Sequence, residues 1–201
     1  MPYVCLQDYV DAARSGGVIA LPTDTVWGVA VQPEHGATLY KLKQRSLEKS
    51  LILMGASAAD LWPYVSIDET EWRLMTERHW PGQLTLVVPS SLKVPLVVHP
   101  KTPDFIGVRV PDHPLARQVL ALTGPLATTS ANLSGQTNLM NVEQILAQFP
   151  QVYGLDDDAI KELLGDLAQG VVLSPPSGLP STVARWQSRH WEILRQGTVY
   201  L

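Results

Sequence analysis

The sequence predicts an α/β protein that folds as one domain. Short apolar runs with the character of buried strands alternate with segments whose apolar residues recur at helical spacing. The 201 residues suffice for one substantial core, and the content of 45% hydrophobic and 17% charged residues is that of a globular protein. The sequence contains no internal repeat, low-complexity tract or interdomain linker, so we expect a single domain over residues 1–201.

Composition excludes several classes of protein. The formal net charge of −4 lacks the basic excess of a dedicated nucleic-acid binder, so any polyanion must meet a local cluster of cations. No apolar run approaches the thickness of a bilayer and the first residues do not form a signal peptide, so we expect a cytoplasmic protein without membrane contact. The single cysteine, Cys5, excludes an internal disulfide and is expected to be a small buried residue near a helix start.

The first helix is expected to end at Gly16-Gly17 and to lead into a buried strand over residues 18–21. Pro22 ends this strand, and Thr23, Asp24 and Thr25 then project from its end. Hydroxyls and a carboxylate at such a strand exit are typical of a ligand crevice, although a simple turn without any ligand has the same pattern.

A local cluster of cations follows the second predicted helix, which begins near Ala37. Lys43 and Arg45 are two positions apart, so their side chains point the same way only where the backbone is extended. We therefore place Arg45 just beyond the helix, with both side chains turned towards one pocket. The alternative is a solvated helix end whose cations complement the helix dipole.

The remaining elements follow from the same patterns. Strands are expected at residues 51–54, 84–88, 94–98, 105–110, 126–128, 171–173, 181–184 and 191–194. Helices are expected at residues 58–64, 69–77, 115–122 and 142–149, and a last one follows Asp156-Asp157-Asp158, which we interpret as a helix cap and not as a metal site.

Two features of these strands indicate a binding site. Arg109 lies within an apolar strand, where an arginine either pairs with a structural carboxylate or binds an anion, and the sequence leaves both open. The strand at 126–128 ends in Thr129, Ser130 and Asn132, which repeats the hydroxyl-rich exit of the first strand. Two such exits in one sheet favour a lined crevice over two unrelated turns.

The strong local signatures of hydrolases, P-loop enzymes and zinc proteins are absent from the sequence. Nothing in the spacing of Ser130, Ser134 and His113 supports a catalytic triad. The hydroxyl-rich strand exits, the cation cluster and the arginine within a strand together indicate a small polar substrate beside a phosphorylated one.

Seven ordered motifs resemble those of the YrdC/TsaC family, the L-threonylcarbamoyladenylate synthases. They run from the first helix to the last residues and are Pro22-Thr23-Asp24-Thr25-Val26-Trp27-Gly28, Lys43-Gln44-Arg45 with Lys49, Trp80-Pro81-Gly82 with Leu84-Thr85, Val108-Arg109-Val110-Pro111 with His113-Pro114, Thr129-Ser130-Ala131-Asn132 with Ser134-Gly135, Pro180-Ser181-Thr182-Val183, and Leu194-Arg195 with Gly197.

The resemblance implies one open α/β domain with a twisted, mostly parallel but mixed sheet, flanking helices and a deep cationic cavity. It implies that L-threonine, bicarbonate and ATP, the last with Mg²⁺, give threonylcarbamoyl-AMP and pyrophosphate, for transfer to a tRNA adenosine by a separate transferase. Direct tRNA binding stays open. Two alternatives are a paralogue of the same fold that serves as an RNA-binding or ribosome-associated module, and a relative that uses another acceptor.

The resemblance also assigns roles to single residues. The threonine contacts it implies are Thr23, Arg109, Thr129 and Ser181, and the ATP contacts are Lys43, Arg45, Lys49, Ser130, Asn132 and Arg195. Lys43 and Arg45 are the residues expected to act in catalysis. The sequence departs from the family pattern at Trp27, Ser50, Met54 and Gln83, and its length resembles the short, single-domain form.

Overall fold

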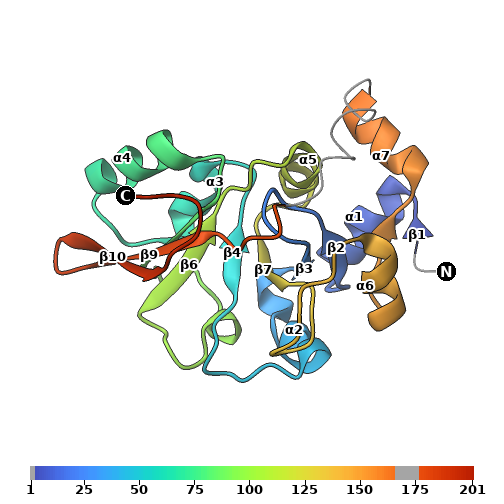
Figure 1. Ribbon diagram of the computed structural model, residues 1–201, viewed down its shortest axis with the longest axis horizontal. Helices are drawn as coiled ribbons and strands as arrows, with labels where there is room; N and C mark the ends of the chain where they lie inside the picture. The colour runs from blue at the N-terminus through green and yellow to red at the C-terminus, as the bar shows by residue number, and fades with distance from the viewer. Residues whose placement is uncertain (1–2, 166–176) are drawn as a thin grey trace.

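A computed structural model describes residues 3–165 and 177–201, which form an α/β fold around one large mixed sheet (Figure 1). Its eight strands are β2 (Ile19–Leu21), β3 (Gly28–Val31), β4 (Ile52–Met54), β5 (Leu84–Pro89), β6 (Phe105–Arg109), β7 (Leu126–Ser130), β9 (Thr182–Gln187) and β10 (His190–Arg195). They are ordered β10-β9-β5-β6-β4-β7-β3-β2. Two short strands, β1 (Tyr3–Val4) and β8 (Gly154–Leu155), pair separately and in parallel.

Helices flank both faces of the sheet (Figure 1). Those of the described residues are α1 (Leu6–Arg14), α2 (Ala37–Lys43), α3 (Ala58–Leu61), α4 (Glu69–His79), α5 (Pro114–Thr123), α6 (Val142–Gln148) and α7 (Asp157–Leu164). Short 3₁₀ turns lie at η1 (Pro33–His35), η2 (Trp62–Tyr64) and η3 (Leu96–Val98). None of the described helices is long and apolar enough to cross a bilayer.

The direction of the strands corrects one expectation. The sheet is mixed, as expected, but the expectation of mostly parallel pairing is wrong, since only the β4–β6 and β5–β9 pairs are parallel among its described strands. The other pairs are antiparallel. The chain between β2 and β3, and that between β9 and β10, is too short for the crossover that parallel neighbours need.

Alternation along the strands separates a core face from a site face. Leu53, Leu84, Leu86 and Ala184 point to the face where α2, α4 and α6 pack and belong to one buried cluster. A second buried cluster lies on the other face and joins α1, α5 and α7 to β2, β3 and the start of β7. The site face of β5, β6 and β9 contributes no residue to this second cluster.

Most predicted elements are present, with residue-level corrections. Asp156 caps α7 through a side-chain oxygen, which confirms the interpretation of the acidic run as a helix cap, and Asn141 caps α6 in the same way. The strand expected at 94–98 is wrong, because residues 96–98 form the 3₁₀ turn η3, in which the Val98 amide donates to the Pro95 carbonyl and not to a neighbouring strand. Cys5 precedes α1 as its N-cap, but it is exposed and not buried. The strand expected at 171–173 lies outside the described residues.

Strand β3 is an element that the sequence analysis did not predict. It pairs antiparallel with both β2 and β7, so these two strands run in the same direction and their carboxyl ends lie at the same edge of the sheet. The two hydroxyl-rich exits, after Leu21 and at Ser130, are therefore neighbours across Gly28, which pairs with both residues.

Candidate active site

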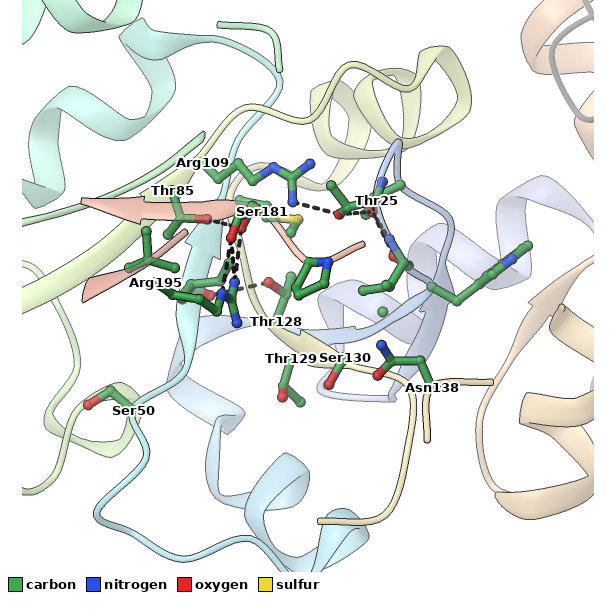
Figure 2. Close-up of a pocket in the computed structure, with 18 of the residues that line it drawn as sticks. Thr25, Ser50, Thr85, Arg109, Thr128, Thr129, Ser130, Asn138, Ser181 and Arg195 are labelled. Atoms are coloured by element: carbon green, nitrogen blue, oxygen red, sulfur yellow. Dashed lines mark hydrogen bonds between the residues drawn. The ribbon is translucent and has the colours of Figure 1, made fainter. Parts of the chain in front are cut away.

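The site face of the sheet is the floor of a cavity of about 370 Å³ (Figure 2). Every second residue of four segments faces it: Ile52 and Met54, Thr85 and Val87, Thr128 and Ser130, Ser181 and Val183. The other lining residues are Thr23, Thr25, Val26, Trp27, Gly28, Arg45, Ser50, Arg109, Thr129, Asn138, Pro180 and Arg195. Three arginines and no carboxylate line the cavity among the described residues, so it suits an anionic ligand.

Strand register gives the cavity two ends. Met54 pairs with Arg109, whereas Ile52, two residues earlier, pairs with Gly107 and Thr128. Ser130 lies two residues further along β7, away from Arg109, and Figure 2 shows it with Ser50 and Asn138 on the side opposite Arg109. We call these the Arg109 end and the Ser130 end. Apolar side chains of Ile52 and Val87 lie between them.

Arg109 is fixed by three hydrogen bonds. Its Nη2 donates to Asp24 Oδ1 at 2.6 Å, its Nη1 to Thr25 Oγ1 at 2.8 Å and its Nε to the Gly82 carbonyl at 3.0 Å. The structure therefore shows both features that the sequence left open, a carboxylate partner and a place in the cavity wall. A guanidinium has five N–H donors, so two remain for a ligand.

A second polar group at this end surrounds Ser181. Its hydroxyl is 2.8 Å from Thr85 Oγ1, and Arg195 donates to it and to the Ser181 carbonyl through Nη2, at 3.2 and 2.8 Å. Arg195 thus stands over the start of β9, with its guanidinium in the cavity wall (Figure 2). Burial lowers the pKa of Arg195 from its ordinary value, but arginine keeps its charge.

Thr23 lines the cavity, but its hydroxyl belongs to the turn after β2. It donates its one hydrogen to the Val26 carbonyl at 2.6 Å and accepts from the main-chain amides of Thr25 and Val26. The hydroxyl of Thr25 is 3.0 Å away, and in a hydrogen bond between the two Thr25 is the donor. Thr23 shapes this wall and has no hydroxyl hydrogen left for a ligand.

The backbone at Gln44 determines where the cations point. Gln44 ends α2 in a left-handed conformation, with φ of 50°, so Arg45 leaves the helix direction, as expected. Arg45 lines the cavity and donates to the carbonyls of Lys49 and Ser50 at 2.8 and 2.9 Å. Lys49 itself is exposed and does not line the cavity.

Lys43 is buried behind the strand exit, so the expectation that its side chain opens into the same pocket as Arg45 is wrong in this structure. Its Nζ donates to Thr129 Oγ1 at 3.0 Å, to Asn132 Oδ1 at 3.1 Å and to the Ser130 carbonyl. Thr129 and Ser130 line the cavity, but Lys43, which is 1% exposed at the end of α2, does not. Lys43 thus holds the Ser130 exit in place.

The pKa of Lys43 is far from its ordinary value. Burial, with smaller contributions from the charges of Arg45 and Lys49, lowers it from 10.5 to about 7. The oxygens around the ammonium are all neutral, so no carboxylate offsets its desolvation. An anion bound at the Ser130 end would favour the charged form.

The predicted site residues fall into two groups. Thr23, Arg45, Arg109, Thr129, Ser130, Ser181 and Arg195 line the cavity, whereas Lys43, Lys49 and Asn132 do not. Thr129 turns its hydroxyl to Lys43, and Asn132 is held behind the wall by Lys43 and Ser130 Oγ, the latter at 2.6 Å. The structure therefore gathers residues from all parts of the chain at one cavity, with a supporting layer behind it.

Sequence analysis assigned no site role to several residues that matter here. Thr128, Val87 and Asn138 line the wall, and β-strand alternation predicts the first two once their neighbours are assigned. Gly107 pairs with Ile52 and Val87, which line the cavity, and an added Cβ would be 2.7 Å from Ile52 Cγ2. Asn138 follows an irregular loop and has no comparable signal.

The donors around the cavity suit phosphate better than a bare metal ion. No group of three or more His, Cys, Asp or Glu able to hold a metal occurs among the described residues. Arginine and lysine N–H groups and hydroxyls bind phosphate oxygens directly.

Comparison with known proteins gives the family. The family model Sua5_yciO_yrdC, described as "Telomere recombination", matches residues 11–197. The chain is 36% identical over 198 residues to a threonylcarbamoyl-AMP synthase of Vibrio cholerae, covering 96% of this chain and 97% of that one. It is 34% identical to the protein of the same name from Vibrio campbellii, covering 95% and 98%.

Solved structures agree with the sequence comparisons. P. abyssi Sua5 in complex with L-threonine has a TM-score of 0.78 and 26% identity, with 94% of this chain and 52% of that chain covered. This chain thus spans about half the length of Sua5. E. coli YciO has a TM-score of 0.75 and 25% identity, with 94% and 87% covered. The chain belongs to the Sua5/YciO/YrdC family.

Proposed function

We propose that this protein is a threonylcarbamoyl-AMP synthase, which makes threonylcarbamoyl-AMP and pyrophosphate from L-threonine, bicarbonate and ATP. The observation that carries the proposal is one cavity with an arginine fork at one end and a cationic, hydroxyl-rich wall at the other. The Vibrio relatives that match nearly the whole chain carry this name, and a related Sua5 structure holds L-threonine. We propose the cytoplasm as its place of action.

The reaction has two steps, and its atoms balance without a side-chain nucleophile. The threonine amine condenses with bicarbonate to give N-carboxythreonine and water. A carboxylate oxygen of this carbamate then attacks the α-phosphorus of ATP, the bond to the bridging oxygen breaks, and pyrophosphate leaves. The carbamate decomposes readily in water, so the enzyme acts by holding two reactants in line within a shielded cavity.

The Arg109 end is the proposed amino-acid site. The two N–H groups that Arg109 does not use within the protein suit the threonine carboxylate. Ser181 and Thr85 lie beside it, and their hydroxyls offer hydrogen bonds to the amine or side chain of the substrate. Thr23 contributes through the shape of its turn, whereas Thr129, whose hydroxyl is held by Lys43, lies beside Ser130 at the other end (Figure 2).

The Ser130 end is the proposed nucleotide site, with ATP entering as its Mg²⁺ complex. Arg45 and Ser130 line this end, with Lys43, Lys49 and Asn132 behind or beside them, and we assign the phosphate contacts to this group. Arg195, the remaining proposed ATP contact, lies beside Ser181 at the Arg109 end. A cation about 4 Å from a phosphate oxygen contributes an attraction on the order of 4 kcal/mol at an effective dielectric near 20, before desolvation. A few such cations suffice to hold a triphosphate and to stabilise the charge of the leaving pyrophosphate.

Pyrophosphate release with each reactant omitted in turn tests the proposal. We expect release only when ATP, bicarbonate and threonine are all present. Release without threonine would indicate another acceptor, and no release together with tight RNA binding would indicate the RNA-binding alternative. Either result contradicts the proposed function.

Matched arginine variants locate the amino-acid site. Arg109→Lys keeps the charge but loses the fork, so we expect a higher KM for threonine. Arg73→Lys, in an exposed ion pair on α4, should match the wild-type protein.

We also propose that a separate transferase carries the product to tRNA. The purified protein should therefore leave tRNA unmodified.

A further inference from the structure

Asp24 is the carboxylate that pairs with Arg109, and the pair is buried. The side chain of Arg109 is 3% exposed and that of Asp24 11% exposed, with 2.6 Å between Nη2 and Oδ1. The second oxygen of Asp24 is also buried, and it has no hydrogen-bond partner among the described residues. Such a pair contributes little net stability, because desolvation of both charges opposes their attraction. Its location therefore calls for an explanation other than stability.

The pair orients Arg109 towards the cavity. Asp24, Thr25 and Gly82 each accept one bond from the guanidinium, which is planar, so three bonds fix both its position and its plane. Asp24 itself is not among the residues that line the cavity, whereas Arg109 is. Its side chain therefore acts on the site through the position of Arg109.

The main chain of Asp24 is held by segments that are distant in sequence. Its carbonyl accepts from Gln83 Nε2 at 3.1 Å and from the Ser177 amide at 3.3 Å. Gln83 Oε1 in turn accepts from Thr198 Oγ1 at 2.5 Å, and Thr198 lies three residues after Arg195. Hydrogen bonds thus connect the turn that orients Arg109 to the segment that carries Arg195.

We propose that Asp24 is the positioning residue of the amino-acid site: it holds the Arg109 fork in the plane that grips the substrate carboxylate, and Gln83 ties it to the C-terminal segment beside Arg195. This inference rests on the proposed function and deepens it. Asp24→Asn keeps the shape and one acceptor oxygen but removes the charge. We expect the KM for threonine to rise by on the order of tenfold or more, because small displacements of a positioning group are costly. The KM for ATP should change much less, since Arg45 and Ser130 are at the other end and Arg195 is held by its own bonds to the Ser181 carbonyl.

The experiment is a double-mutant cycle on pyrophosphate release, with Asp24→Asn, Arg109→Lys, the double variant and the control Glu77→Gln, which removes a carboxylate from an exposed pair. If Asp24 acts through Arg109, the two effects on the KM for threonine are not additive, and Asp24→Asn changes little in the Arg109→Lys background. A general structural role would instead raise both KM values, or give additive effects.

The outcomes separate this inference from the proposed function. A wild-type protein that releases no pyrophosphate with threonine contradicts both. An active wild-type protein whose Asp24→Asn variant keeps the same KM for threonine overturns the role of Asp24 alone. If Asp24→Asn fails to fold, Gln83→Leu and the pair Thr198→Val and Thr198→Ser provide the test. Leucine at 83 and valine at 198 should raise the KM for threonine, and serine at 198 should restore it. Unchanged values in these variants overturn the inference.

Discussion

Lys43 should make the stability of this protein depend on pH above neutrality. Its pKa is about 7 in the folded protein and 10.5 in an unfolded chain, so between these values the unfolded state binds more protons. Stability therefore rises with pH across this window, and the cost of the buried charge is present in full below pH 7. A surface lysine, whose pKa is the same in the folded and unfolded states, would not make the free energy of unfolding depend on pH.

The magnitude follows from the two pKa values. One pKa unit corresponds to about 1.4 kcal/mol, and about half of the folded molecules have already lost the proton at pH 7. Raising the pH from 7 to 9 should therefore stabilise the wild-type protein by about 2 kcal/mol relative to Lys43→Met, which keeps an unbranched side chain, one atom shorter, but cannot titrate. At about 2–4 °C per kcal/mol for a chain of this size, the difference in Tm shifts by about 4–8 °C.

Urea or thermal unfolding of both proteins at pH 7 and pH 9 measures this difference. The loss of the Lys43 hydrogen bonds gives Lys43→Met an offset that is the same at both pH values. Groups that titrate elsewhere in the chain cancel between the two proteins. A gap in stability that stays constant from pH 7 to pH 9 would refute the buried, carboxylate-free environment described for Lys43.

Three further substitutions test other parts of the site. Arg45→Ala should reduce turnover by one or more orders of magnitude with little change in Tm, because this half-buried side chain bonds only to loop carbonyls; normal turnover in steady-state assays contradicts its place at the nucleotide end. Gly107→Ala should destabilise the fold by about 1–3 kcal/mol and raise the KM for substrates, because the added Cβ would clash with the stiff side chain of Ile52. Unfolding curves and kinetics that match the wild type would contradict this close contact beside the cavity. Thr23→Val should cost about 1–3 kcal/mol because Val26 O loses its donor, and Thr23→Ser should recover most of that loss in the same unfolding assay; equal losses in both variants would rule out the hydroxyl as the cause.

The sequence predicted the strand ends that build the site but not the long-range side-chain contacts that hold them together. Apolar runs that end in Thr23 and Thr129 carry a local signal, and both exits lie at one edge as expected. Which carboxylate meets Arg109 depends on a contact across 85 residues, for which periodicity carries no information. The same limit applies to Gln83, whose two partners are 59 and 115 residues away.

Lys43 shows how one backbone conformation decides a side chain's environment. The spacing of Lys43 and Arg45 indicated a common pocket, under the assumption of an extended backbone between them. Instead Gln44 adopts a left-handed conformation, so the last residue of α2 points beneath β7 while Arg45 reaches the cavity. A left-handed glutamine is uncommon and has no reliable sequence signal. The expectation of mostly parallel strands failed for a different reason: β2 and β3, and β9 and β10, are joined by connections too short for parallel neighbours.

The central claim is that an amino acid and a nucleotide react in one cavity through a carbon taken from bicarbonate. Mass spectrometry of the product formed from ¹³C-bicarbonate, threonine and ATP tests it most directly. The account predicts an adduct of threonine and AMP that contains one labelled carbon, with pyrophosphate in equal amount. An adduct of threonine and AMP without the label, or no adduct at all, would contradict it.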